Sequence, residues 1–186
     1  AAAAKNQKGV MVSMLAGVSI ESLSAIFHTD RIIRIMPNTP ASVGEGMTLV
    51  CAGNGVTQED MNGFLQLIAS VGKADILPEK QFDAASALSG CGPAYMFLML
   101  ESLADGAVKC GLARDKALQY AAQTMLGSAK LLLESGEHPG KLKDAVCSPG
   151  GSTIAGVAAL EDGGLRASAM HAVESAYLRT VELGKH

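Results

Sequence analysis

The pattern of apolar and polar positions changes once along this chain, near residue 78. Before that point, short apolar runs of strand length alternate with amphipathic segments of helix length. A helix is predicted over residues 19–27 with Ser19 as N-cap, and a second opens at Thr57 with the character of a capping box and continues to residue 70. The predicted strands are residues 10–15, 31–36, 47–52 and 73–77. Strands that alternate with helices indicate an α/β sheet.

Beyond residue 78 the pattern is helical throughout, and no convincing strand remains. We therefore predict two domains, residues 1–78 with the sheet and residues 79–186 with helices only. The predicted helices are residues 82–109 with a break at 90–93, 114–134, 140–147, a helix from 152 or 153 towards 160, and 165–183.

Several of these helices are apolar on more than one side, and residues 93–108 are apolar nearly all round. A helix of that kind is buried on every side in its folded protein. The helical half is too short to bury so much apolar surface within one protomer. We infer an intertwined homodimer in which the helices of the partner complete the core.

The segment of residues 148–153 carries the clearest candidate chemistry. Pro149 is expected to end the helix before it, and Gly150 and Gly151 allow a ligand to approach their backbone. Ser152 or Thr153 then caps the following helix. The first N–H groups of a helix are unpaired and lie at the positive end of its dipole, so the segment suits a carboxylate or a phosphate. The same pattern is also typical of an ordinary corner between two helices.

Composition narrows the classes of function. The chain is 48% apolar, 18% charged and 4% aromatic, with a net charge of -3, so neither nucleic acid nor an anionic membrane is expected as a partner. The four cysteines form no CxxC pair and have no histidine at zinc-site spacing, so we expect free thiols, no metal and a cytoplasmic protein. No apolar run reaches the length of a membrane helix. The N-terminal alanine run lacks the features of a signal peptide.

Two glycine pairs resemble parts of a dinucleotide fingerprint without completing it. Gly53 and Gly55 follow a predicted strand, but Gln58 occupies the place of the third glycine. Gly90 and Gly92 lie between predicted helices and are followed by a proline. Neither pair is interpreted as a cofactor site.

Other candidate polar groups are weaker when they are considered one at a time. Asn38 and Thr39 lie between two prolines at the end of a predicted strand, where α/β sheets bind ligands, although local pattern alone favours a rigid turn. Ser86 and Ser89 precede the break at 90–93 and could face a cleft as hydrogen-bond donors, or bond to their own backbone. Glu79 and Asp144 are candidate partners of a ligand cation or ordinary surface charges.

Taken together, four motifs resemble the pyrroline-5-carboxylate reductase family in order and in separation. They are residues 34–40 (RIMPNTP), 88–95 (LSGCGPAY), 138–144 (HPGKLKD) and 148–154 (SPGGSTI). The resemblance implies a Rossmann domain for NADPH or NADH followed by a helical dimerisation domain. It also implies the last step of proline synthesis, the reduction of 1-pyrroline-5-carboxylate to L-proline, and a homodimer that can assemble into a ring of dimers.

The resemblance also implies roles for individual residues. Ser86 stands at the position of a hydroxyl considered for protonating the ring nitrogen, and Glu79 near that nitrogen. Ala145 stands where some relatives have a side chain that reaches the cofactor. The substrate carboxylate is expected on Ser148, Gly150, Gly151, Ser152 and Thr153, and the nicotinamide and its ribose beside Ala16, Gly17, Asn38 and Thr39.

The sequence departs from the family at its start. The resemblance implies about a hundred residues before Val10, which carry the glycine fingerprint, so we expect this chain to be a truncated form. Two alternatives remain open. One is a dimerisation fragment without catalytic activity. The other is a β-hydroxyacid-type dehydrogenase, which requires a catalytic lysine on the long helix after the sheet, where Lys109 stands only at the far end.

Overall fold

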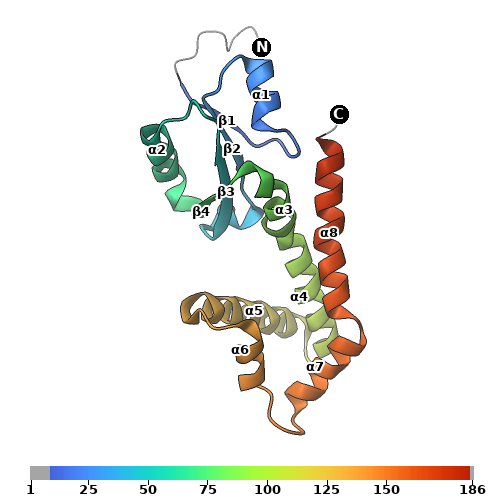
Figure 1. Cartoon of the computed structure of the whole chain (residues 1–186). Helices are drawn as coiled ribbons and strands as arrows, with labels where there is room; N and C mark the ends of the chain where they lie inside the picture. The colour runs from blue at the N-terminus through green and yellow to red at the C-terminus, as the bar shows by residue number, and fades with distance from the viewer. Residues whose placement is uncertain (1–8, 185–186) are drawn as a thin grey trace. The chain divides into compact units, whose positions relative to one another are not determined.

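The structure is a computed structural model that describes residues 9–184 (Figure 1). Its elements are β1 (Met11–Ser13), α1 (Ile20–Phe27), β2 (Ile32–Met36), the 3₁₀ helix η2 (Thr39–Val43), β3 (Gly46–Ala52), α2 (Gln58–Ile68), the 3₁₀ helix η3 (Ala69–Val71), β4 (Gly72–Ile76), α3 (Glu79–Ser89), α4 (Gly92–Lys109), α5 (Arg114–Ser135), α6 (Pro139–Ala145), α7 (Ser152–Asp162) and α8 (Leu165–Leu183).

The chain forms two compact units. One extends to Pro93 and includes the segment from His171 onwards, and the other is Ala94–Met170. The boundary predicted near residue 78 stays a prediction. The N-terminal alanine run, from which no signal peptide was expected, lies outside the described residues.

The first unit is built on a four-stranded sheet with the order β1-β2-β3-β4. β1 is parallel to β2, β3 is antiparallel to β2, and β4 is parallel to β3. The four predicted strands are confirmed, each with bounds shifted by one to a few residues. Local signals also placed the starts of α1 and α2 correctly, because Ser19 caps α1 and Thr57 forms a capping box with Asp60 at the start of α2, whereas α3 begins at Glu79, three residues before its predicted start.

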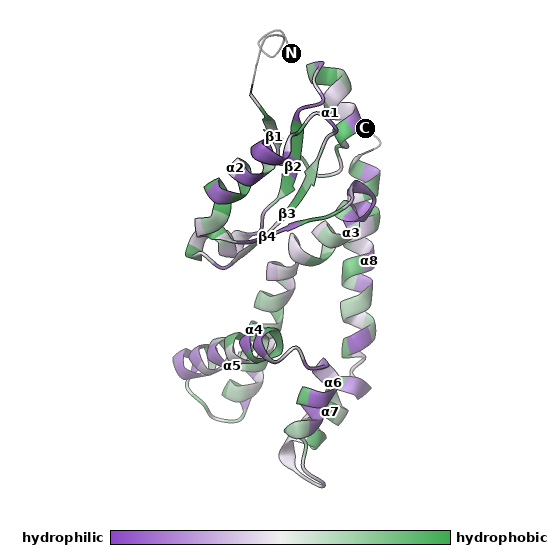
Figure 2. Ribbon diagram, turned by 60° about the vertical axis from the view of Figure 1, so that its left-hand side comes forward, coloured by the Kyte–Doolittle hydropathy of each residue, from purple (hydrophilic) through white to green (hydrophobic). Residues whose placement is uncertain are grey.

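Alternate residues of the strands pack on opposite faces of the sheet, as the pleat requires. Ile33, Ile35 and Val50 form a core with Met61 of α2 on one face. Leu49 and Cys51 pack against Phe82 of α3 on the other face. Figure 2 shows mostly apolar colouring along β2 and β3, whose residues are largely buried.

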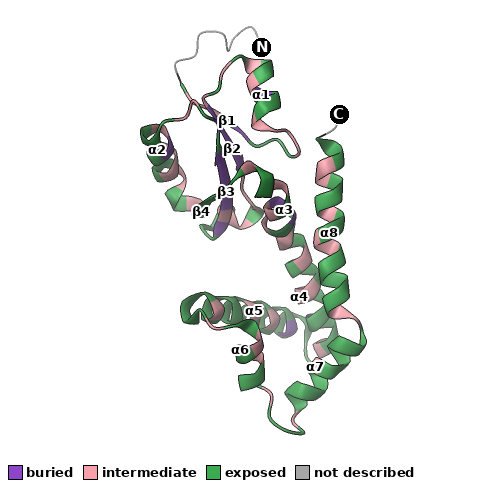
Figure 3. Ribbon diagram, viewed as in Figure 1, coloured by how far each residue is buried: buried purple, intermediate pink, exposed green. Residues whose placement is uncertain are grey.

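The helices of the second unit bury little. In Ala94–Met170 the buried apolar residues are Ala104 and Ala117, while Phe97, Leu126 and Leu133 are 62%, 58% and 72% exposed. Figure 3 shows the same contrast, with buried positions concentrated in the sheet and exposed positions along α5 and α7. As predicted from the sequence, these helices have apolar surface that one protomer does not cover.

Two predictions at the turn before α7 are wrong. The helix before it, α6, ends at Ala145, so Pro149 does not end it directly. The N-cap of α7 is Gly151, no side-chain hydrogen bond caps this helix, and Ser152 is its first residue. The reason lies in the turn itself, because the glycines that allow the chain to reverse also occupy the cap position that a serine would otherwise fill.

The capping box at the start of α2 should make stability depend on pH. The backbone N–H of Thr57 donates to Asp60 Oδ2 at 3.0 Å, and Arg31 Nη2 donates to Asp60 Oδ1 at 2.8 Å. The hydrogen bonds from Thr57, followed by the contact with Arg31, hold the pKa of Asp60 below its ordinary value of 3.8. A lowered pKa in the folded state stabilises the chain above the unfolded pKa, and this contribution disappears as pH falls through the folded pKa.

We expect the thermal midpoint of the wild type to fall between about pH 5 and pH 3, and that of Asp60→Asn to fall less over the same interval. Differential scanning calorimetry at fixed protein concentration measures how steeply the thermal midpoint of each protein changes with pH. Glu59→Gln is the matched control, because it removes a neighbouring charge and leaves the capping box intact. Equal slopes in wild type and Asp60→Asn would contradict the assignment.

Candidate active site

The predicted cofactor residues lie at one edge of the sheet. β1 and β2 are parallel, with Ser13 paired to Arg34, so the loop after β1 and the loop after β2 leave the sheet at the same edge. Ala16 and Gly17 belong to the first loop, and Asn38 and Thr39 to the second. Parallel α/β sheets bind ligands at this carboxyl edge.

Gly17 is a position that only glycine fits. Its φ of +73° lies in the left-handed region, and an added Cβ would lie 2.8 Å from both the backbone N of Gly184 and the carbonyl oxygen of Thr180. Gly17 is therefore packed against the end of α8 on that side, while Ala16 beside it is exposed.

Asn38 joins three elements. Its Nδ2 donates to the carbonyl oxygen of Ser89 at the end of α3, at 3.0 Å, and its Oδ1 accepts from the N–H of Met47 in β3, at 2.9 Å. It also precedes η2, whose first residue is the exposed Thr39. The Asn38 side chain is thus occupied by the protein, and the rigid loop predicted from the two prolines is held from both sides.

Ser86 lies close to this edge. It is 7% exposed on α3, and its carbonyl oxygen accepts from the N–H groups of Gly90 and Cys91, where α3 ends. An added Cβ on Gly90 would lie 3.3 Å from Ser86 Oγ and 3.5 Å from Met36 Cγ, so Ser86 is near the end of β2. The Oγ of Ser89 is buried without a hydrogen-bond partner. The structure therefore brings the two serines and Asn38 together.

Glu79 is not part of this group. It is the first residue of α3, about two helical turns before Ser86. Its Oε1 accepts from the N–H of Ile20 at 2.7 Å and from Arg34 Nη1 at 3.3 Å. Its expected place beside the ring nitrogen stays a prediction.

The sequence analysis missed Arg34, which is 2% exposed in the middle of β2. Its guanidinium donates to Asp83 Oδ1 at 2.7 Å as well as to Glu79, and lies 4.3 Å above the ring of Phe82. A charged residue inside an apolar strand was the available signal, because such a residue is almost always paired when buried. Its partners were out of reach of any local pattern, since both lie more than 40 residues further along the chain.

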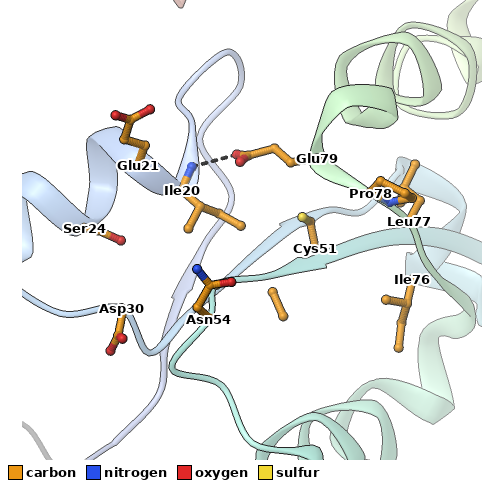
Figure 4. A pocket seen from close by; sticks show the side chains of 12 residues that line it. Ile20, Glu21, Ser24, Asp30, Cys51, Asn54, Ile76, Leu77, Pro78 and Glu79 are labelled. Carbon is orange, nitrogen blue, oxygen red and sulfur yellow. Dashed lines mark hydrogen bonds between the residues drawn. The ribbon is translucent and has the colours of Figure 1, made fainter.

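A cavity of about 710 Å³ opens between α1 and the ends of β3 and β4. Figure 4 shows Glu79 and Cys51 facing it, together with Ile20, whose N–H bonds to Glu79. Burial, followed by the nearby Glu79 carboxylate, raises the pKa of the Cys51 thiol, so this thiol stays protonated at neutral pH. The cavity lies beside the first residues of α3 rather than beside Ser86 at its end.

The predicted anion loop lies in the second unit. The N–H of Gly151 donates to the carbonyl oxygen of Ser148 at 3.0 Å, and Gly150 has a φ of +66°. Proline at the second position and a left-handed glycine at the third are typical of a type II turn. An added Cβ on Gly151 would lie 2.3 Å from Ser148 Oγ and 3.1 Å from the Ser148 carbonyl oxygen, so a side chain there would displace the Ser148 hydroxyl.

The turn delivers exposed donors at the start of α7. No side chain caps this helix, and Ser152 and Thr153 are exposed in its first turn. Unpaired N–H groups at a helix start attract anions. The predicted donor groups are therefore present, although the N-cap of the helix is Gly151 and not Ser152 or Thr153.

Two neighbouring residues of this unit also carried predictions. Asp144, a candidate partner for a ligand cation, pairs with Lys143 at 2.7 Å, and this contact raises the pKa of Lys143. Ala145 is the last residue of α6 and is exposed.

Within residues 9–184 no group of three or more histidine, cysteine or acidic side chains could hold a metal ion. In the same range no helix has the length and apolar character needed to cross a membrane. All four cysteines are free thiols.

Comparison with known proteins identifies the family. The family model for pyrroline-5-carboxylate reductase dimerisation matches residues 79–183 of this chain. The chain belongs to the pyrroline-5-carboxylate reductase family. The predicted resemblance is confirmed.

Relatives in this family are identical to the chain at nearly half of the aligned positions. The pyrroline-5-carboxylate reductase of Glycine max is 48% identical over 174 residues, which are 94% of this chain and 64% of the relative. That of Escherichia coli strain K12 is 44% identical over 181 residues, which are 97% of this chain and 67% of the relative. The chain thus spans roughly two thirds of the length of these reductases.

Solved structures of the family have the same fold. The pyrroline carboxylate reductase of Plasmodium falciparum with NADP bound is 36% identical, with a TM-score of 0.89 over 94% of this chain and 71% of that one. The enzyme of Coxiella burnetii is 34% identical, with a TM-score of 0.90 over 100% of this chain and 69% of that one. The predicted fold class, a partial Rossmann sheet followed by a helical dimerisation domain, is therefore confirmed.

Proposed function

We propose that this chain carries out, or contributes to, the reduction of 1-pyrroline-5-carboxylate to L-proline with NADPH or NADH. The observation that carries this proposal is the identity of 48% with the Glycine max reductase over 94% of the chain. The NADP bound to the Plasmodium falciparum relative supports a nicotinamide cofactor. The product assigns the reaction to proline biosynthesis, and we propose a cytoplasmic location.

We assign the nicotinamide to the edge formed by the loops after β1 and β2, beside Ala16, Gly17, Asn38 and Thr39. The polar groups at this edge fit such a ligand, because the Ser89 hydroxyl is buried there without a partner. A buried polar group without a hydrogen bond is costly, and a bound amide or ribose hydroxyl would satisfy it. When bound, the cofactor supplies the hydride.

Ser86 is proposed to assist the imine nitrogen. An imine accepts hydride more readily when its nitrogen is protonated, so a hydroxyl that donates or relays a proton there accelerates reduction. Ser86 is nearly buried and lies near the end of β2. Its surroundings exclude water from most of the side chain, which favours a defined hydrogen bond.

The turn of residues 148–153 is proposed to bind the substrate carboxylate. The donors are the backbone N–H groups of Ser152 and Thr153 and the hydroxyl of Thr153, with Ser148, Gly150 and Gly151 shaping the turn. Fixing one end of a small substrate orients its reactive carbon, and this positioning supplies much of the catalysis.

We propose that the chain forms a homodimer, which can extend to a ring of dimers. The second unit buries few side chains, and an apolar cavity of about 770 Å³ is lined by Leu103, Tyr120, Met125 and Leu132 of α4 and α5 and by Val146 after α6. This surface lies in the segment that matches the dimerisation family. A partner's helices would remove it from water.

Binding and turnover test the proposal. We expect isothermal titration calorimetry to detect NADPH binding and a spectrophotometric assay to detect oxidation of NADPH that depends on pyrroline-5-carboxylate. Absence of binding up to millimolar NADPH would instead favour a dimerisation module without its own catalysis. Oxidation of a β-hydroxyacid in place of imine reduction would favour the dehydrogenase alternative.

Thr153→Ala tests the carboxylate turn. Loss of a hydrogen bond to a charged group costs about 1.5–3 kcal/mol, so we expect KM for the imine to rise about 10- to 100-fold while KM for NADPH changes less than about twofold. Thr153→Ser keeps the hydroxyl and should remain close to wild type. Equal increases in both KM values would count against the assignment.

A further inference from the structure

The Arg34 side chain binds α3, which bears the proposed proton donor Ser86. Through Glu79 of α3 it is also linked to the start of α1, where the proposed cofactor loop ends. We propose that Arg34 is a positioning residue that fixes the loop of residues 14–19 through Glu79. In this role the Glu79 carboxylate caps the start of α1 and does not bind the substrate. The link from this loop to the cofactor rests on the proposed function. The fixing of the loop itself does not.

Arg34 determines how α3 is oriented on the sheet. Its guanidinium bonds to Glu79 and Asp83, at 3.3 and 2.7 Å, and stacks on Phe82 at 4.3 Å. These three partners occupy positions i, i+3 and i+4 of α3, which form one face of a helix. Ser86 lies on the same face two turns further along. A single buried side chain of β2 thus sets the direction in which α3 presents Ser86.

Glu79 carries the connection across to α1. Its Oε1 accepts the N–H of Ile20 at 2.7 Å, between residues 59 positions apart in the sequence (Figure 4). Ile20 is the first residue of α1, where N–H groups have no partner within the helix. The hydroxyl oxygen of Ser19 accepts from the N–H of Ser22, at 3.1 Å. The start of α1 is therefore capped twice, once locally by Ser19 and once by the carboxylate from α3.

Both ends of the loop consequently depend on Arg34. Its backbone is paired in register with Ser13, the last residue of β1, where the loop begins. Its side chain holds Glu79, which holds Ile20, where the loop ends. Ala16 and Gly17 lie between these two anchors. The backbone of β2 at Arg34 thus anchors the start of the loop, and the Arg34 side chain, through Glu79, anchors its end.

The charges favour this role over substrate binding. One arginine faces two carboxylates, and Glu79 already has two donors on a single oxygen. A carboxylate held by a guanidinium and a backbone N–H keeps its position without ligand. This is the behaviour expected of an anchor that must be in place before the cofactor binds.

Ile20→Pro removes the N–H that donates to Glu79, and it also replaces a side chain that packs on Leu49, Cys51 and Phe82. Proline is tolerated at the first position of a helix, and the ψ of 158° at Ser19 is compatible with a following proline. Ile20→Val is the matched control, because it removes one methylene group and keeps the N–H. Glu79→Ala removes the acceptor, and Glu79→Gln restores an oxygen at the same place.

Backbone hydrogen exchange gives the readout that does not need turnover. In Glu79→Ala we expect exchange at Ile20 and in residues 14–19 to accelerate about tenfold or more, with most of the protection regained in Glu79→Gln. In Ile20→Pro the loop alone should accelerate, and Ile20→Val should match the wild type. Unchanged exchange in both Glu79→Ala and Ile20→Pro would overturn the inference.

Kinetics separates positioning from substrate contact. Ile20→Pro and Glu79→Ala should raise KM for NADPH about tenfold and leave KM for the imine within about twofold. A larger increase for the imine would place Glu79 on the substrate and overturn the inference. If the wild type neither binds NADPH nor turns over, the proposed function fails, while the exchange data still decide whether the Glu79 carboxylate fixes the loop, and the same measurement on Arg34→Met decides whether Arg34 holds Glu79 in place.

Discussion

Replacing Gly72 with alanine is expected to destabilise the first unit by about 3 kcal/mol or more, among the largest effects of a single substitution in this chain. Gly72 has φ 133° and ψ -150°, a region that essentially only glycine occupies. An added Cβ would lie 2.2 Å from the carbonyl oxygen of Gly46 and 2.4 Å from its nitrogen. These atoms are backbone, so no side-chain rotation relieves the contact.

The clash falls where β3 and β4 begin their pairing, because Gly46 and Gly72 are register partners. The next residue, Met47, donates its N–H to Asn38. Separation of the two strands there should therefore also loosen the Asn38 loop at the proposed nicotinamide edge. Urea unfolding followed by circular dichroism at fixed protein concentration measures the loss of stability.

Gly63→Ala is the matched control for that experiment. Gly63 lies within α2 of the same unit, and nothing is within 4 Å of an added Cβ. Alanine is favoured over glycine in a helix interior, so this variant should gain about 0.5–1 kcal/mol. Similar urea midpoints for Gly72→Ala and Gly63→Ala would show that β3 and β4 adjust to the added Cβ without loss of stability.

Local chemistry made most elements of the fold predictable. The caps at Ser19 and Thr57 were found because each depends on residues within a few positions. Gly136 ends α5 in the left-handed region, as expected for a helix followed by glycine. The break in the long helix lies between Ser89 and Gly92, where the glycine and proline positions had placed it.

The direction of β3 was within reach of the sequence but was not predicted. Residues 37–45 connect β2 to β3, and a parallel connection needs a crossover of about a dozen residues or more. The antiparallel pairing of β2 with β3 follows from that length. The cap of α7 failed for a different reason, since serine and glycine both suit a cap and only the turn geometry selects Gly151.

The Arg34 network could not be predicted from local pattern. Its members come from β2, α3 and the start of α1, and only Arg34, a charge inside an apolar strand, stands out in its own segment. The chemistry of the proposed site is similar in this respect. Motif order identified the family, whereas the hydrogen bonds that hold Asn38 and Glu79 depend on contacts between residues 9 to 59 positions apart.

The second large effect is expected for Phe82→Ala, which should cost about 3–5 kcal/mol of unfolding free energy. Phe82 is fully buried and packs on Leu49 and Cys51 of β3. Its ring also lies under the Arg34 guanidinium, at 4.3 Å. Truncation leaves a cavity beneath α3 and removes a cation–π contact of about 0.5–2 kcal/mol.

Phe82→Leu separates these two contributions. Leucine fills most of the volume and should cost far less than alanine, but it cannot stack on the guanidinium. Phe64→Ala, on the opposite face of the sheet and only partly buried, controls for loss of an aromatic ring elsewhere in the same core. Equilibrium unfolding in urea at one protein concentration gives all three values, because association would otherwise shift the midpoints.

Phe82 also lies between Glu79 and Ser86 on α3, so the loss of its ring should affect the hydrogen bond between Glu79 and Ile20 as well as stability. Without the ring, Arg34 keeps its carboxylate partners but loses the surface that orients its plane. Under conditions where Phe82→Ala remains folded, exchange at Ile20 should accelerate, and in Phe82→Leu it should accelerate less. A fully protected Ile20 in folded Phe82→Ala would mean that Glu79 holds α1 without help from the stacked arginine.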